Sequence, residues 1–211
     1  PGQTRTFYIR LSIASGLMSA FLTLRSEPAF VAYDHDEQIL LGIYYGIIAV
    51  MVLYNLFVFF SLRDRAYLSY VAMTLFMGFW FAGYNGLAKE YLWPTSNQEA
   101  WPVWRLSRLL GFWAWIWILD FVRRFLHTRE IAPRIYRLFT ALIGLNIVLI
   151  AAVLLDQYRL IQPFLNPLWQ LEWLLVLTVT VIVWRRGYRP ARYLLIAWAA
   201  MIGGVTLNLL F

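Results

Sequence analysis

Six apolar runs, each long enough to cross a lipid bilayer, constrain this chain more than any other feature. A helix rises about 1.5 Å per residue, so about 20 apolar residues span the roughly 30 Å of a membrane's hydrocarbon core. The runs cover residues 38–62, 66–87, 103–125, 135–155, 162–184 and 192–211. The sequence therefore predicts an all-α polytopic membrane bundle with six visible transmembrane helices.

Arginine is concentrated in every second connection between these runs. The connections after the first, third and fifth runs contain or adjoin Arg63, Arg65, Arg123, Arg124, Arg129, Arg134, Arg137, Arg185, Arg186, Arg189 and Arg192. The basic residues in the connections after the second and fourth runs are only Lys89 and Arg159. Because basic loops stay on the cytoplasmic side, this alternation predicts that the N-terminus lies outside the cell membrane.

The composition excludes several other classes of protein. With 62% hydrophobic and 14% charged residues, the chain has too little polar surface for a water-soluble globule. Its net charge of +7 lies beside the ends of the apolar runs, where anionic membrane lipids account for it without nucleic acid as a partner. The chain has no cysteine, which excludes disulfides and thiolate metal sites.

The first 37 residues follow a different pattern. Apolar and polar residues alternate over 7–13, Ser15 and Gly16 supply a turn, and a second extended run covers about 17–24. This pattern predicts a β-hairpin that ends at Glu27 and Pro28, with Asp34, Asp36 and Glu37 before the first membrane helix. Two strands are marginal alone, so we expect them to complete a larger β-domain whose earlier strands precede Pro1. An apolar run that is still open at Phe211 leads us to expect a seventh helix beyond it.

Three blocks of sequence resemble a known family. They are GIYYGIIAVMVLYNLFVFFSLRDRAYLSYV at 42–71, NGLAKEYLWP at 85–94 and RRGYRPAR at 185–192. The resemblance is to the bacterial seven-transmembrane receptors with diverse intracellular signalling modules, the 7TMR-DISM family. It is most specific in the first two runs, at Tyr44, Tyr45, Gly46, Tyr54, Asn55, Leu56, Arg63, Asp64, Tyr67 and Tyr70.

The resemblance implies a membrane sensor in the bacterial inner membrane. Residues 1–37 are similar to the C-terminal end of the jelly-roll-like periplasmic sensor domain of these receptors, and 38–211 to their transmembrane domain. Such receptors pass a periplasmic or intramembrane signal to a cytoplasmic output module, commonly a diguanylate cyclase or a histidine kinase. For this segment we expect neither catalysis nor a cofactor, because its two histidines, His35 and His127, lie on opposite sides of the membrane.

Ionisable groups inside the apolar runs give the candidate site. Glu172 lies deep in the fifth run, where a carboxylate is costly unless it is paired, protonated or hydrated. Arg105 and Arg108 share a face near the outer end of the third run, and Asn166 and Gln170 accompany Glu172. We predict an outward-facing polar pocket for a small ligand or a lipid headgroup formed by these five residues. Two alternatives stay open: a purely structural ion pair, and arginines that extend toward lipid phosphate.

Small and polar residues of the first run predict helix contacts. Gly42 and Gly46 have the spacing that lets two helix backbones approach closely, either within the chain or in a homodimer. Asn55 is expected to act as an internal hydrogen-bonding strut, and Asp120 to pair with Arg123 and Arg124 at i+3 and i+4.

Two other functions compete with the receptor. A small-solute transporter or channel subunit would have discontinuous helices in matching halves, but only the fifth run is interrupted, by Pro163 and Pro167. A retinal protein needs a lysine for its Schiff base, and Lys89 in an outer connection is the sole lysine of the sequence.

Overall fold

The computed structural model describes residues 26–87, 90–91 and 101–210, without the side chains of 84, 101–104 and 201–210. The helices are α1 (Glu27–Leu62), α2 (Arg65–Tyr84), α3 (Trp101–Phe125), α4 (Thr128–Ile131), α5 (Pro133–Leu154), α6 (Tyr158–Arg185) and α7 (Ala191–Leu210). No strand occurs within these described ranges, and the all-helical prediction for the membrane domain is confirmed there. The β-hairpin predicted over residues 7–24 lies outside them.

The start of α1 corrects the predicted N-terminal boundary. The helix begins at Glu27, so the segment before Gln38 continues α1 instead of ending a strand. Pro28 is compatible with this start because its missing N–H would have no helical acceptor in the first turn. Glu27 adds a favourable acidic group at the same end, and Asp34 accepts a hydrogen bond of 2.9 Å from Gln38 one turn later.

Four of the described helices are long and apolar enough to span a membrane by length and composition: α1, α2, α5 and α6. The prediction of six such helices is therefore supported only in part. In α3 the apolar character is interrupted by Arg105, Arg108, Asp120, Arg123 and Arg124, while the described apolar part of α7 covers Ala191–Ala200. Pro163 and Pro167 lie inside α6, which continues through both.

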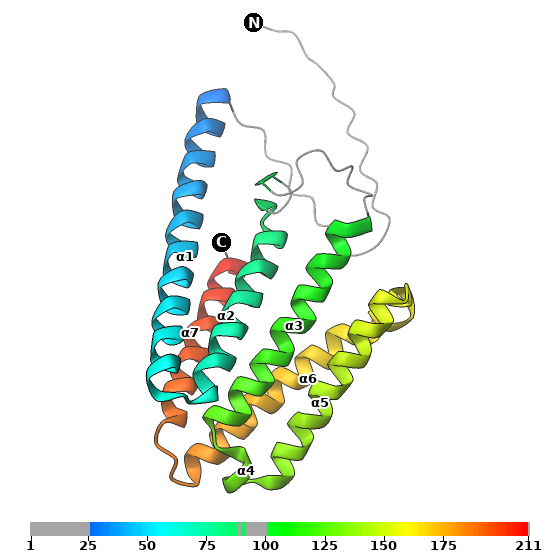
Figure 1. Cartoon of the computed structure of the whole chain (residues 1–211). Helices are drawn as coiled ribbons and strands as arrows, with labels where there is room; N and C mark the ends of the chain where they lie inside the picture. Colours follow the sequence, from blue (N-terminus) through cyan, green and yellow to red (C-terminus); the bar gives the residue numbers. More distant parts are fainter. Residues whose placement is uncertain (1–25, 88–89, 92–100, 211) are drawn as a thin grey trace, which may run out of the picture.

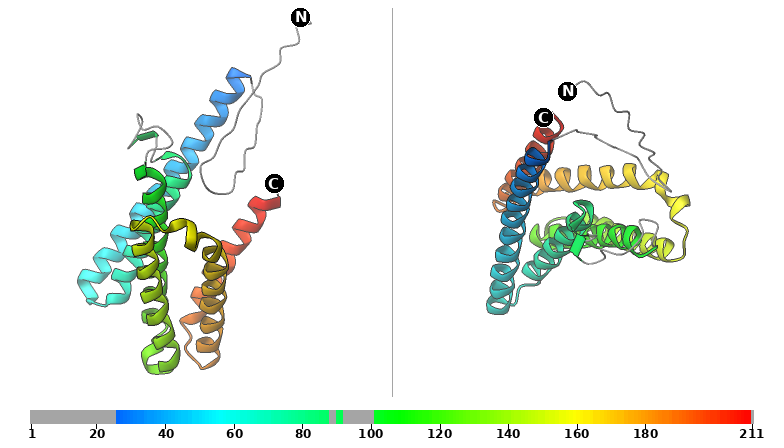
Figure 2. Two further views of the ribbon diagram at one scale, coloured as in Figure 1. Left: turned by 90° about the vertical axis from the view of Figure 1, so that its right-hand side faces the viewer. Right: turned by 90° about the horizontal axis from the view of Figure 1, so that it is seen from above.

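The long helices form two layers. Helices α2, α3 and α5 lie side by side, α6 and α7 lie behind them, and α1 flanks α2 at the edge (Figures 1 and 2). Trp173 of α6 contacts Trp115 of α3 in the other layer and Trp198 of α7 in its own layer, both edge-on, with ring centroids 5.0 and 4.5 Å apart. The Trp115–Trp173 contact joins the two layers in the core.

Three connections come together at one end of the bundle, which we call the basic end: the α1–α2, α3–α5 and α6–α7 connections (Figure 1). They contain the arginine-rich segments whose alternation was apparent in the sequence. Each turns through a residue of positive φ: Arg63 at 57°, His127 at 48° and Gly187 at 94°. The left-handed conformation ends a helix abruptly and permits these short connections.

The glycines at close helix contacts differ from those predicted. A Cβ added to Gly42 or Gly46 would meet nothing within 4 Å. A Cβ on Gly83 would instead lie 2.7 Å from Ser107 Oγ, and one on Gly111 would lie 3.3 Å from Trp80 Nε1. Among the described residues, close approach therefore occurs between α2 and α3, and a homodimer contact through Gly42 and Gly46 stays a prediction.

Candidate functional site

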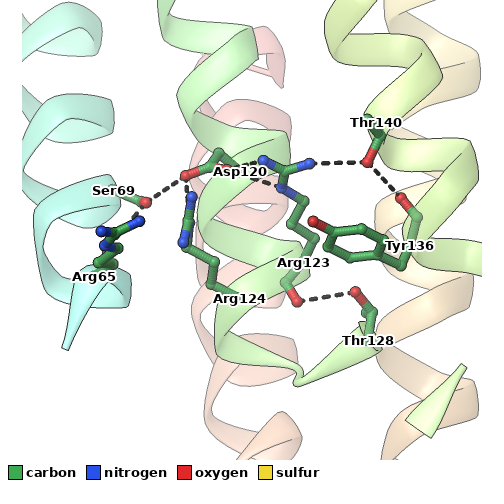
Figure 3. Close-up of polar contacts among 8 residues, drawn as sticks. All are labelled: Arg65, Ser69, Asp120, Arg123, Arg124, Thr128, Tyr136 and Thr140. Carbon is green, nitrogen blue, oxygen red and sulfur yellow. Dashed lines mark hydrogen bonds and ion pairs between the residues drawn. The ribbon is translucent and has the colours of Figure 1, made fainter. Parts of the chain in front are cut away.

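Asp120 is the centre of a buried polar cluster between α2 and α3. Its side chain is almost fully buried and accepts hydrogen bonds from Ser69 Oγ at 2.5 Å and Arg124 Nε at 2.7 Å (Figure 3). Arg123 binds the other carboxylate oxygen with both Nε and a terminal nitrogen, at 2.8 and 2.5 Å. The expected i+3 and i+4 pairs are confirmed, and Ser69 adds a contact from a second helix.

The cluster continues to α4 and α5. A terminal nitrogen of Arg123 donates to Thr140 Oγ1 at 2.9 Å, and its guanidinium lies 5.2 Å from the ring centroid of Tyr136 (Figure 3). The fully buried Thr128 donates from Oγ1 to the carbonyl of Arg123 at 2.9 Å. The Asp120 cluster, defined as Ser69, Asp120, Arg123, Arg124, Thr128, Tyr136 and Thr140, thus connects four helices near the basic end.

A pocket of about 460 Å³ opens at the same end of the bundle. Its walls come from α1, α2, α3 and the three connections that follow α1, α3 and α6; they are Met51, Tyr54, Asn55, Asp64, Ala66, Tyr67, Tyr70, Phe121, Phe125, His127, Tyr188 and Pro190. A concave, mainly aromatic surface with few polar groups is typical of small-molecule sites. We call it the basic-end pocket.

Two contacts join the connections at this end of the bundle. The Tyr188 hydroxyl lies 3.1 Å from His127 Nδ1, and Arg186 donates to the carbonyl of Ile131 at 2.7 Å. Burial, and then the nearby carboxylate of Asp64, raise the pKa of Tyr188, so its hydroxyl stays protonated beside His127. The α6–α7 connection is thereby held against the connection that follows α3.

Asn55, predicted as a strut, lies in the wall of the same pocket. It is the buried residue of α1, and its Nδ2 donates to the carbonyl of Met51 one turn earlier at 2.8 Å. One donor of its side-chain amide is therefore satisfied within α1.

Glu172 lies fully buried near the middle of α6. It accepts a hydrogen bond of 2.8 Å from Nδ2 of Asn146, which is fully buried on α5. Asn166 and Gln170, expected beside it, are exposed.

The two arginines of the predicted pocket have partners at the other end of the bundle. Arg105 is buried and forms an ion pair with the exposed Asp156 of the α5–α6 connection. The guanidinium of Arg108 lies 5.1 Å from the ring centroid of the buried Tyr158. A ligand-binding role for these arginines with Glu172 stays a prediction.

Three of the residues that make these contacts were not predicted from the sequence, and a sequence signal exists for one of them. Asn146 is a single amide within an apolar run, so the reasoning applied to Asn55 would also have identified it. Ser69 and Tyr188 carried no such signal, because their roles depend on which helix or connection lies opposite. Within the described ranges, no group of three or more His, Cys, Asp or Glu side chains is placed to hold a metal ion.

Comparison with known proteins identifies the family. Residues 37–211 match the family model described as 7TM diverse intracellular signalling. No curated protein and no solved structure matches the chain. The family match covers well over half of the sequence and agrees with a multi-pass membrane protein built from apolar helices. The chain therefore belongs to the 7TMR-DISM family of membrane sensor domains.

Proposed function

We propose that this domain receives a periplasmic or intramembrane signal and relays it to a cytoplasmic output module of the diguanylate cyclase or histidine kinase type. The proposal places the domain in the bacterial inner membrane, with its N-terminus periplasmic and the basic end in the cytoplasm. Its main support is the basic-end pocket, where α1, α2, α3 and the α6–α7 connection contribute to one surface. A displacement of any of these elements would alter the shape of the basic end, which is the surface that the proposed output module would contact.

The length of α1 makes it the best candidate for the moving element. Its 36 residues extend over about 54 Å, well beyond the roughly 30 Å of a membrane's apolar core. Asn55 is its buried residue, whereas α2 and α3 are held together by the Asp120 cluster. A displacement of α1 would therefore change the pocket wall at Met51, Tyr54 and Asn55 at small cost in packing.

The relay follows from different affinities for two states. The signal is either a small ligand in the basic-end pocket or an influence on the outer part of α1. It shifts the equilibrium between two positions of α1, and the size of the shift is set by the difference between its interaction free energies with the two positions. The helix pair α2–α3 serves as the fixed reference in this movement, which is a shear of packed helices.

A reversible lock between α1 and α2 tests the relay in the complete protein. Gly78 of α2 faces Ile48 of α1, whose Cγ2 lies 3.5 Å from an added Cβ, so the double variant Ile48→Cys, Gly78→Cys places two thiols on facing helix surfaces, where oxidation can be tested for a cross-link. The segment has no cysteine of its own, which keeps the lock specific within it. We expect oxidation to change the rate at which the output module forms its product and reduction to restore it, with both single variants unaffected. An output that is the same in the oxidised and reduced double variant, despite a formed disulfide, would refute a relay through α1.

The orientation is tested with single cysteines and a membrane-impermeant maleimide. Glu130 at the basic end and Gln157 in the α5–α6 connection are both exposed. In intact spheroplasts we expect Gln157→Cys to be labelled and Glu130→Cys to react only after lysis. The opposite result would reverse the proposed topology.

A further inference from the structure

The Glu172–Asn146 pair contains two buried acceptor oxygens that have no donor among the described residues. Asn146 Nδ2 donates to Glu172 Oε1 at 2.8 Å. Among the described residues, neither Glu172 Oε2 nor Asn146 Oδ1 has a hydrogen-bond partner, although both atoms are buried. A carboxylate and an amide in mutual contact would thus leave one acceptor each unsatisfied.

The orientation of the Asn146 amide is determined by its own helix. Nδ2 also donates to the carbonyl of Leu142 at 3.0 Å. If nitrogen and oxygen were exchanged, Oδ1 would face this carbonyl, an acceptor that cannot donate to it whatever the protonation state of Glu172. The free amide atom of Asn146 is therefore its oxygen.

One proton changes this inventory of donors and acceptors. An ionised glutamate only accepts hydrogen bonds, whereas a protonated one has an O–H donor. A proton on Glu172 Oε2 turns this atom into a donor. Asn146 Oδ1, the other unsatisfied acceptor, can then accept its hydrogen bond. The proton also removes a charge about 20 Å from the basic end, at a depth where a carboxylate is costly.

Charged groups on the neighbouring helices are engaged elsewhere. Among the described residues, Asn146 is the hydrogen-bond partner of Glu172, and none of the ion pairs formed there includes Glu172. On α3, Arg105 and Arg108 contact Asp156 and Tyr158, and Asp120 binds Arg123 and Arg124. The remaining groups on helices that contact α6 are Arg134, Tyr136 and Arg137 of α5 and Arg192 and Tyr193 of α7, all within the first two turns from the basic end.

We propose that Glu172 and Asn146 form a proton-binding site inside the membrane domain, in which Glu172 carries the proton on Oε2 and this O–H donates a hydrogen bond to Asn146 Oδ1. Release transfers this proton to water and leaves a carboxylate with a single amide donor. The carboxylate needs further donors, so release requires α5 and α6 to separate enough to admit water. The site is independent of the proposed relay, because it concerns a different helix pair and no output module.

Infrared spectroscopy of the complete protein in phospholipid vesicles tests the site with the proton itself as the probe. At neutral pH we expect the wild-type spectrum to contain the C=O stretching band of a protonated carboxylic acid that Glu172→Gln removes. Gln is a neutral side chain of nearly the same shape that can both accept from and donate to Asn146, so the variant should fold. Circular dichroism of the same vesicles checks this.

A second variant tests the partner. In Asn146→Leu the acid loses the acceptor for its O–H, so we expect its C=O band to persist but shift. Identical wild-type and Glu172→Gln spectra in the carboxylic acid region would show that Glu172 is ionised and overturn the proposal. A band that belongs to Glu172 but is unchanged by Asn146→Leu would overturn the assignment of Asn146.

Discussion

The α2–α3 and α5–α6 interfaces each bury one acidic side chain, but they satisfy it in different ways. Asp120 is 5% exposed and Glu172 0%. Asp120 receives hydrogen bonds from two arginines and a serine, whereas Glu172 receives one from an asparagine amide. Burial by itself therefore does not decide how an acid is accommodated in this bundle; the available donors do.

Position along the membrane explains the difference. Asp120 lies five residues before the end of α3, so Arg123 and Arg124 can neutralise it and still lie close to the basic end. Glu172 lies near the centre of α6, where an arginine would itself be costly to bury. An ion cluster suits the end of the bundle, and a neutral pair suits its middle.

The largest expected effect comes from Asp120→Ala. The substitution leaves two guanidinium groups and Ser69 without their shared acceptor, and breaking a buried ion pair from one side costs about 3 kcal/mol or more. We expect the free energy of unfolding in mixed micelles to fall by that amount. Glu130→Ala, which removes an exposed carboxylate at the same end, is the matched control. Equal losses in the two variants would mean that the cluster contributes nothing specific.

A bulky residue at the α2–α3 contact should have the next largest effect. Gly83→Leu places a Cβ 2.7 Å from Ser107 Oγ, and the rest of the side chain must displace α3. Overpacking of this kind costs about 2 kcal/mol. Gly144→Leu makes the same exchange on α5, where nothing lies within 4 Å of the added Cβ. We expect the free energy of unfolding to fall in Gly83→Leu and to stay unchanged in Gly144→Leu. A Gly83→Leu variant as stable as the wild type would contradict close approach of α2 and α3.

A smaller loss is expected at the α5–α6 interface. Asn146→Leu removes the donor to Glu172 Oε1, and hydrogen bonds between membrane helices contribute about 0.6 kcal/mol, with about 1.7 kcal/mol as the upper range. We expect a decrease of about 1 kcal/mol in the unfolding free energy, with Asn166→Leu, an exposed position on α6, unchanged. If Asn146→Leu lowered the free energy of unfolding as much as Asp120→Ala does, the hydrogen bonds of the two buried acids would contribute equally, and the proposed difference between the α2–α3 and α5–α6 interfaces would be refuted.

Ser69→Ala should have the smallest effect. Asp120 loses its 2.5 Å hydrogen bond from α2 but keeps both arginines of α3, so we expect a decrease of about 0.5 kcal/mol. Ser61→Ala, at an exposed position of α1, provides the baseline in the same unfolding measurement. A loss larger than that of Asn146→Leu would make Ser69 a main support of the cluster.

Local spacing in the sequence predicted the contacts that one helix makes with itself. Asp120 with Arg123 and Arg124 is such a case, since residues three and four apart share a helix face. Asn166 and Gln170 were expected beside Glu172, but they lie six and two residues before it, spacings that do not share a helix face, and they are exposed while Glu172 is buried. Proximity in the sequence was mistaken for a common face.

The beginning of α1 shows another limit. Glu27 and Pro28 resemble the end of a strand and also the first turn of a helix, because proline fits both places. The structure resolves this ambiguity in favour of a helix that continues without interruption to Leu62.

The sequence by itself determined four of the six bilayer-length apolar helices that it predicted, the family and the gathering of arginines in alternate connections, because hydrophobic length and charge placement are properties of single segments. Only the tertiary structure decided that Ser69 reaches Asp120, that Asn146 meets Glu172 and that Tyr188 contacts His127. Those contacts depend on how each helix is rotated about its axis against its neighbours. That rotation is set by the packing of all the side chains together, which no segment specifies alone.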